Sequence, residues 1–431
     1  MRPSLRAICV VLIVLIATVV IIVLPGVPPV LAVGLWAAVA VVMLGDLFAS
    51  PTRRAVTAEI DLPEAAFTGM DIPMKLTLTP TARRLPAQVE ARIEMPDGFA
   101  GEQAFAVTDG TGAVNLRGRL RGLHSIKSIW LRWSSPLRLW DIVPRWALSA
   151  TVKVEPNIHP VSSGKIDAQV RMALFGVKDS NTKGAGSEFH QLRDFTTGMD
   201  NRMIDWKRSA RRRDLVAREM RAEENHQVIL CLDNGHLMRE EIDGLPKIDH
   251  AINAALATAW AAGIGGDLVG IYSFDSHPRQ WVPPAPGRAA FPRLRSEMAM
   301  MNYASVQSNP TLGLTTLSSH LSRRSLIIVF SDFVDTTTAE LLIENIAVLN
   351  KSHLILFVAM DDPATQAIAD AKVDGLDAVA EAVAASDMLR ERQIVMDRLA
   401  RMGVLVINTR PNALTAELVS SYINIKAREL L

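Results

Sequence analysis

The chain has 431 residues, a formal net charge of +1 and only two cysteines. A net charge this close to zero gives no overall field that would indicate a nucleic-acid or anionic-lipid partner. The two cysteines exclude a cysteine cluster with metal-ligand spacing. The length beyond the N-terminal apolar segment allows two domains, at roughly 100–200 residues each.

Two nearly uncharged apolar runs, residues 8–24 and 30–47, follow one another near the N-terminus. Each is close to the ~20 residues that a helix needs to cross a bilayer. They predict a transmembrane helical hairpin within residues 1–50. The alternative is a cleaved signal peptide, since Arg2 and Arg6 precede a short first run. Against it, a second apolar run follows at once, and no small-residue cleavage site leads into a polar segment.

Basic residues flank both ends of this predicted hairpin. Arg2 and Arg6 precede it, and Arg53 and Arg54 follow it. The positive-inside rule therefore places both ends on the cytoplasmic side. We expect a multi-pass membrane protein whose soluble part faces the cytoplasm.

Residues 55–160 are predicted to form a small, all-β sandwich-like domain. Met74–Thr79 and Val89–Met95 alternate apolar and polar residues with a period of two, as half-buried antiparallel strands do. Turn residues such as those of 96–98 and 109–112 separate the segments. The tryptophans near residues 130–146 are expected to pack in the core or at its edge, with an aromatic recognition surface as the alternative.

Residues 161–225 are predicted to be a linker followed by a conspicuously basic segment. The run at 207–221 contains two acidic residues, Asp214 and Glu219, and seven basic ones: Lys207, Arg208, Arg211, Arg212, Arg213, Arg218 and Arg221. Such a run is compatible with nucleic-acid or lipid-headgroup binding. A nucleic-acid platform usually adds interleaved aromatics, and only Trp206 is near, so a structural or protein-interface role is favoured.

Residues 226–431 are predicted to form an α/β domain with a doubly wound parallel sheet. Asp233 and Asp332 each follow a strongly apolar strand, and helix-like segments alternate with further strands. Since the carboxyl ends of parallel strands meet at one edge, we expect both carboxylates at the edge where such folds bind ligands.

The pattern around these carboxylates resembles the metal-binding motif of von Willebrand factor A domains. The motif's Asp-x-Ser-x-Ser reads Asp233 to Leu237 here, with Gly235 and Leu237 in the serine positions. The resemblance implies a degenerate metal site formed by Asp233, Thr311 and Asp332. No cofactor is expected, apart from weak binding of Mg²⁺ or Mn²⁺ at most. The alternative is that these residues cap strand and helix ends.

A second resemblance comes from the segment before Asp233. Its residues include Gly198, Asp200, Arg202, Asp205, Trp206, Lys207, Ser209, Ala210 and Arg211. Together with Gly266-Asp267, Ser325–Phe333, Arg392–Gly403 and Tyr422–Leu431, they resemble the DUF58 family of membrane-anchored, von Willebrand A-like proteins. The resemblance covers roughly the last 250 residues. It implies partnership with a MoxR-type AAA+ ATPase, with Arg202, Asp205, Trp206, Lys207 and Arg211 as signature or protein-interaction residues.

These features predict an adaptor or scaffold rather than an enzyme. We expect it to bind a MoxR-type AAA+ ATPase, client proteins, or both, in assembly, maturation or remodelling of envelope-associated proteins. The sequence contains no Walker A loop, nucleophile elbow or His-Glu-x-x-His motif. Two alternatives remain: a divalent-metal enzyme at Asp233 and Asp332, and a membrane-tethered nucleic-acid binder that uses residues 207–221.

Overall fold

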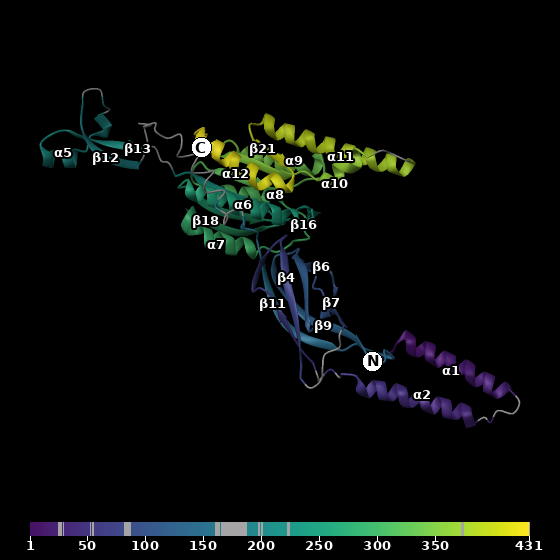
Figure 1. Cartoon of the computed structure of the whole chain (residues 1–431). Coiled ribbons are helices and arrows are strands. Elements are labelled where there is room, and N and C mark those ends of the chain that lie inside the picture. Colours follow the sequence, from purple (N-terminus) through teal and green to yellow (C-terminus); the bar gives the residue numbers. More distant parts are fainter. Residues whose placement is uncertain are drawn as a thin grey trace. The chain divides into compact units, whose positions relative to one another are not determined.

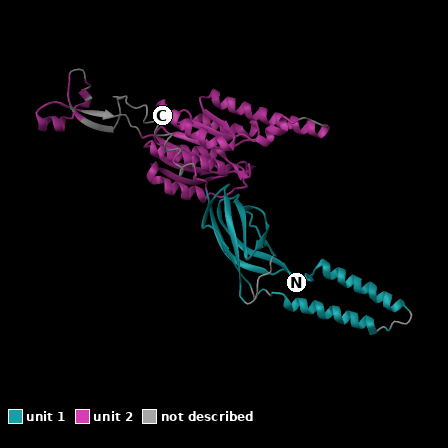
Figure 2. Ribbon diagram, viewed as in Figure 1, with its two compact units in different colours: residues 1–155 teal, residues 156–431 magenta. Residues whose placement is uncertain are grey.

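A computed structural model describes residues 1–24, 28, 30–51, 53, 56–81, 88–159, 164, 188–196, 199, 201–221, 225–371 and 375–430. The chain divides into two compact units, Met1–Glu155 and Pro156–Leu431 (Figure 2). Most of the predicted linker, with Gly198 and Asp200 of the signature, lies outside the described residues.

Unit 1 begins with two helices that are long and apolar enough to span a membrane. They are α1 (Leu5–Val23) and α2 (Val30–Ala49), which lie side by side in Figure 1. Ser4 caps α1 by accepting a hydrogen bond from the Ala7 N–H at 3.2 Å. The Trp36 indole donates to the Thr18 hydroxyl at 3.0 Å, which links the two helices through polar side chains on otherwise apolar surfaces.

The end of α2 is joined to the β sheet of unit 1 through Asp46. Its buried carboxylate accepts hydrogen bonds from the backbone N–H groups of Leu137 at 2.8 Å and Leu139 at 3.3 Å, and from the Ser135 hydroxyl. Before α1, the Ser4 N–H donates to the Leu139 carbonyl at 2.9 Å. One loop of the sheet therefore holds both ends of the helical pair.

The remainder of unit 1 is a mainly antiparallel sheet. Its strands are β1 (Arg2–Pro3), β2 (Val56–Asp61), β3 (Ala65–Phe67), β4 (Asp71–Pro80), β5 (Gln88–Ile93), β6 (Phe99–Gly101), β7 (Ala104–Thr108), β8 (Thr111–Gly118), β9 (Gly122–Ser134), β10 (Trp140–Ile142) and β11 (Arg145–Glu155). The main strand order is β1-β10-β9-β5-β7-β8-β4-β2, with β11 paired to β3 and β9. Buried and exposed residues alternate along β4, β5 and β8, as their sequence periodicity predicts.

The strands of the predicted sandwich-like domain are connected through β9 and share one buried core. β9 is long enough to pair with β5, β10 and β11, so one strand links the parts of the sheet. Trp133 is buried in the core, with its ring centroid 6.0 Å from that of Trp146. Trp130 is instead partly exposed beside Arg145.

Unit 2 contains a six-stranded sheet with helices on both faces. Its strands are β14 (Gln227–Asp233), β17 (Leu268–Phe274), β18 (Pro278–Pro286), β19 (Leu326–Phe330), β20 (Leu354–Met360) and β21 (Leu405–Thr409), in the order β18-β17-β14-β19-β20-β21. All pair in parallel except the edge strand β18. The principal helices are α6 (Lys247–Ile264), α7 (Gly287–Ala299), α8 (Pro310–His320), α9 (Thr336–Leu349), α10 (Pro363–Ala369), α11 (Leu376–Arg401) and α12 (Pro411–Ala427). The predicted α/β architecture is confirmed.

Alternate residues of the central strand β14 enter two different cores. Leu230 packs in the core with residues of α6, α7 and α12. Ile229 and Cys231 pack in the core with residues of α8, α9 and α11. A strand covered on both faces must be apolar at every position, which explains the uninterrupted hydrophobic run before Asp233.

The described part of unit 2 also contains several short elements. They are the 3₁₀ turns η2 (Asn201–Met203) and η3 (His236–Arg239), the hairpin of β15 (Glu241–Ile242) and β16 (Leu245–Pro246), and the antiparallel pair β12 (Glu188–Asp194) and β13 (Val216–Arg221). Along the chain, η2 and the short helix α5 (Trp206–Arg212) lie between the paired strands β12 and β13.

Only the second half of helix α11 contributes buried residues to the core of the sheet. Val395, Met396 and Leu399 in its second half are buried in the core. In its first half Leu376 and Val383 are exposed. This half packs beside α10, and the two helices run together in Figure 1.

A buried polar cluster supports the amino end of the sheet, before β17. Asp267 is fully buried and accepts hydrogen bonds from the Lys426 ammonium and the Tyr422 hydroxyl, each at 2.5 Å, and from the His226 N–H at 3.0 Å. Burial raises the pKa of the Tyr422 hydroxyl well above its ordinary value, and the Asp267 charge adds to the effect. This cluster fastens α12 to the sheet.

We expect Asp267→Ala to lower the free energy of unfolding by about 3–5 kcal/mol, because it leaves the buried Lys426 ammonium without its carboxylate. Urea denaturation of the detergent-solubilised protein measures the change. The matched control is Glu417→Ala on the exposed side of the same helix, with an expected change within about 0.5 kcal/mol. Equal losses in both variants would contradict a supporting role for Asp267.

Candidate functional site

The candidate site lies where the parallel sheet of unit 2 reverses its winding direction. From β14 the chain passes to β17 on one side, and later to β19 on the other. Asp233 is the last residue of β14, while Ser331 and Asp332 directly follow β19. The two carboxylates therefore meet at the carboxyl edge of the sheet, at the switch point where open α/β folds bind ligands.

Asp233 is held by three hydrogen bonds. One carboxylate oxygen accepts from the Ser331 hydroxyl at 2.6 Å. The other accepts from the Gly235 N–H at 2.9 Å and from the Ser308 hydroxyl. Burial raises the pKa of Asp233 above its ordinary value, although these hydrogen bonds oppose the shift, and the nearby Asp332 charge adds to it.

Ser308 occupies the space that a side chain at position 235 would need. A Cβ built on Gly235 would come within 1.9 Å of the Ser308 Oγ. The loop after β14 has Gly235 in place of the motif's serine. The hydroxyl of Ser308, from the loop before α8, therefore takes the place of the missing serine hydroxyl. Sequence reasoning missed Ser308. The available signal was its place just before Asn309, which caps α8 and precedes a proline at the first helical position.

The structure corrects the predicted position of Thr311. Thr311 lies within α8, where its hydroxyl accepts a hydrogen bond from the Asn345 amide at 3.1 Å. It does not line the cavity beside Asp233. Because α8 begins at Pro310, the loop hydroxyl that reaches the edge belongs to Ser308 instead.

Asp332 lies between two cationic side chains from different helices. One of its oxygens accepts a hydrogen bond at 2.6 Å from the ammonium of Lys247, the first residue of α6. The other accepts from the Arg392 guanidinium of α11 and from the Phe333 N–H. Lys247 also pairs with Glu240 at 2.5 Å. Burial lowers the pKa of Lys247, but the charges and hydrogen bonds of Asp332 and Glu240 together outweigh that effect, so the pKa lies above its ordinary value.

Arg392 is fixed by two contacts besides its ion pair. It donates to the Met360 carbonyl at the end of β20 at 2.7 Å. Its guanidinium also lies 5.2 Å from the Phe333 ring centroid, within the range of a cation–π contact. The position of this charge is therefore set by three neighbouring groups.

The residues present do not fit a bound divalent cation. Both oxygens of Asp332 are engaged by positive side chains, and Asp233 is engaged by two hydroxyls and an N–H. Mg²⁺ and Mn²⁺ require about six oxygen ligands, so an ion would have to displace Lys247 and Arg392. Within the described residues, no group of three or more His, Cys, Asp or Glu side chains is arranged to hold a metal.

A cavity of about 250 Å³ opens beside the carboxylates. Its lining combines hydroxyls and carboxylates with apolar side chains: Asp233, His236, Leu237, Gln307, Ser308, Pro310, Ser331, Asp332, Phe333, Val334, Thr338 and Leu342. A second hollow of about 100 Å³ borders Lys247, Asp332 and Arg392. The edge therefore offers a mixed polar and apolar surface of the kind that protein partners contact.

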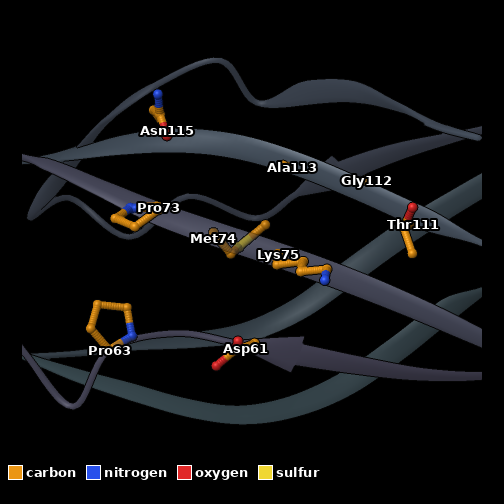
Figure 3. A pocket seen from close by; sticks show the side chains of 9 residues that line it. All are labelled: Asp61, Pro63, Pro73, Met74, Lys75, Thr111, Gly112, Ala113 and Asn115. Atoms are coloured by element: carbon orange, nitrogen blue, oxygen red, sulfur yellow. The ribbon is translucent and has the colours of Figure 1, made fainter.

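A larger hollow of about 750 Å³ lies on the sheet of unit 1. Figure 3 shows its side chains spread along neighbouring strands, with Asp61 and Lys75 as its charged members. They do not converge on one point as binding groups for a small molecule do. We therefore place the candidate site at the edge of the sheet in unit 2.

The signature segment divides into structural and exposed residues. Asp205 caps α5 by accepting from the Arg208 N–H at 3.1 Å. Trp206, Lys207 and Arg211 are exposed on the helix. The side chain of Arg202 lies outside the described residues.

Residues 191–398 match the family model described as "Protein of unknown function DUF58". The chain contains a DUF58 domain. This domain runs from within β12, through both carboxylate-bearing strands, to the second half of α11. It therefore includes the signature residues, Asp233, Asp332 and both cations that contact Asp332. No curated protein matches the chain.

Three solved structures resemble parts of the chain. The conserved hypothetical protein BatB from Bacteroides thetaiotaomicron is 13% identical over 47% of this chain and 100% of its own, with a TM-score of 0.33. Proximal thread matrix protein 1 from the mussel byssus is 9% identical over 47% of this chain and 46% of its own, with a TM-score of 0.28. An uncharacterized membrane spanning protein from Vibrio fischeri is 16% identical over 47% of this chain and 97% of its own, with a TM-score of 0.19.

We expect Asp332→Ala to cost about 3–5 kcal/mol of unfolding free energy, because it leaves the largely buried Arg392 without its carboxylate and Lys247 with only the exposed Glu240. Lys247→Met should cost less, since Asp332 then keeps Arg392. Urea denaturation of both variants measures the difference. A larger loss for Lys247→Met than for Asp332→Ala would contradict the central role of the carboxylate.

The stability of Asp233→Asn should diverge from that of the wild type as pH changes. Because the folded protein raises the Asp233 pKa above its ordinary value of 3.8, the folded state binds the proton more tightly than the unfolded state does. The stability this provides is complete below pH 3.8 and is lost as pH rises through the folded-state pKa. The asparagine side chain of the variant does not titrate. The free energy of unfolding of the variant, relative to that of the wild type, should therefore rise over that pH range.

Urea denaturation at a series of pH values upward from 4 measures this difference. The variant's relative gain should level off once the pH exceeds the folded-state pKa of Asp233. A relative loss with rising pH would show that the pKa is lowered instead.

Proposed function

We propose that the protein is a membrane-anchored adaptor or scaffold of a bacterial inner membrane. Its two N-terminal helices anchor it, the β unit acts as a spacer, and the von Willebrand A-like unit faces the cytoplasm. There it binds a MoxR-type AAA+ ATPase, client proteins, or both, in assembly, maturation or remodelling of envelope-associated proteins. The DUF58 domain and the two apolar helices support this proposal.

The observation that carries the proposal is the Lys247–Asp332–Arg392 arrangement. A von Willebrand A-like edge that used a metal would leave its carboxylates open to the ion. Here two positive side chains supply the charge from within the chain. An edge neutralised in this way can bind a partner without any ion.

The cavity rim favours a protein partner over a small substrate. Val334 is partly exposed there, and His236 is exposed. An ATPase partner would supply the chemical energy, since the sequence of this chain has no Walker A loop.

Charge at both ends of the helical pair supports the proposed orientation. Arg2 precedes α1, Arg6 lies in its first turn and Arg53 follows α2, so the positive-inside rule favours a cytoplasmic soluble part. Protease accessibility in spheroplasts and in inverted vesicles tests this orientation independently of any partner.

The central test is capture of partners by the full-length protein, crosslinked in membranes and identified by mass spectrometry. We expect a MoxR-type ATPase, recovered equally in Mg²⁺ and in EDTA. Val334→Glu at the cavity rim should reduce recovery at least about tenfold, because it adds a charge to a contact surface. The matched control is Val348→Glu, an exposed position on α9 outside the cavity lining, which should leave recovery unchanged.

Each other outcome selects against the proposal. Recovery that EDTA abolishes would make docking metal-dependent and revive a divalent-metal role for Asp233 and Asp332. Recovery of no ATPase with any form would overturn the adaptor function. Nucleic acid retained with a steep salt dependence would move the role to residues 207–221.

A further inference from the structure

The first of two exposed surfaces lies on the short helix α5. Ser209 attaches the helix to β13, since its hydroxyl accepts from the Val216 N–H at 2.9 Å. Trp206, one turn from Ser209, is 67% exposed, and Leu215 just after the helix is also exposed. The helix is thus fixed by a small buried side chain while its largest apolar side chain faces solvent.

This surface is strongly basic. Residues 205–214 contain two acidic residues, Asp205 and Asp214, and five basic ones: Lys207, Arg208, Arg211, Arg212 and Arg213. Lys207 and Arg211 are four residues apart and so form one row along the helix. At ~100° per residue this row begins about 100° around the helix from Trp206.

The second surface lies on α10 and the first half of α11. Leu376, Val379 and Val383 recur at helical spacing and form one apolar stripe, in which Leu376 is 89% and Val383 55% exposed. Ala385, on the other side of the helix, is buried. The first half of α11 is therefore apolar on two faces, and only one of them is covered in this chain.

This second surface is acidic. Residues 362–388 contain six acidic residues and one lysine. Asp377 and Glu381 are four residues apart, and their row begins about 100° around the helix from the stripe. Each helix therefore presents an apolar group beside a charged row, and the two rows carry opposite charges.

We propose that these surfaces bind each other between two copies of this chain. Trp206 of one copy packs on the Leu376–Val379–Val383 stripe of the next, and Lys207 and Arg211 pair with Asp377 and Glu381. On both α5 and α11 the charged row is reached from the apolar group by turning in the same direction around the helix axis, as seen from the N-terminus. Antiparallel packing therefore brings the two rows together.

The contact is heterologous, because two different surfaces of the chain meet. Each copy keeps one open surface of each kind, so the contact repeats and generates a ring or an open chain of copies. A second copy is favoured over a lipid surface because the chain itself contains both complementary surfaces. A lipid headgroup would neutralise the basic row on α5, but it would leave the apolar stripe and the acidic row on α11 unexplained.

Charge reversal tests the contact in detergent-solubilised full-length protein, with molar mass followed by light scattering during dilution. Lys207→Glu with Arg211→Glu should raise the dissociation constant for self-association at least about tenfold, and so should Asp377→Lys with Glu381→Lys. The two reversed proteins should associate when mixed, because their rows are again complementary. Trp206→Ala should weaken association about 30-fold, as loss of an aromatic anchor does.

Matched controls reverse or truncate exposed residues elsewhere. Lys351→Glu, Glu417→Lys and Val348→Ala should leave association unchanged. Circular dichroism of each variant establishes that it is folded. A wild-type protein that stays monomeric at all concentrations, or reversed variants that do not recover on mixing, would overturn the proposal.

A photocrosslinking amino acid at position 206 identifies what Trp206 touches in membranes. We expect crosslinks to residues 376–388, and, when two differently tagged forms are co-expressed, crosslinks between the tags. Crosslinks within one copy only would overturn the second copy as the occupant. Crosslinks only to lipid, nucleic acid or another protein would overturn it as well.

Discussion

The ion pairs of Asp332 tie together the parts of unit 2 that the chain places far apart. Asp332 follows β19, Lys247 begins α6 and Arg392 lies on α11. Helix α6 covers one face of the sheet and α11 the other. One carboxylate therefore fastens both helical layers to the edge between β14 and β19. Loss of this carboxylate would leave two largely buried positive charges, so the arrangement stabilises the edge only as a complete set.

The same arrangement explains why the neighbouring carboxylate is hydrogen-bonded rather than paired with a cation. Lys247 and Arg392 are both occupied by Asp332, so Asp233 depends on Ser308, Ser331 and the Gly235 N–H. Hydrogen bonds compensate the burial of a charge less completely than an ion pair does, and the Asp233 pKa is raised accordingly. The two carboxylates have the same position relative to their strands but different electrostatic surroundings.

Local sequence pattern predicts much of this fold, because the strands of unit 2 are apolar on both faces and those of unit 1 alternate. The convergence of Asp233 and Asp332 also follows from the sequence, since both residues terminate parallel strands. The partners of Asp332 do not follow from it, because Lys247 and Arg392 lie 85 and 60 residues away along the chain. Which helix end reaches the edge depends on how the layers pack. Thr311 was misplaced for a related reason: the start of α8 at Pro310 decides which hydroxyl remains in the loop.

Trp206 on α5 and Leu376 on α11, 67% and 89% exposed, contrast with the buried apolar residues of the central sheet. The central strands have no exposed residue, and the second half of α11 packs into the core. Apolar side chains left outside such a core lower solubility unless something covers them. Trp206 sits on a helix held mainly by Ser209, so this segment contributes little to the core of its own unit. The sequence of α5 is therefore better explained by binding to another surface than by stabilisation of unit 2. The acidic row on α11 is a surface of opposite charge within the same chain.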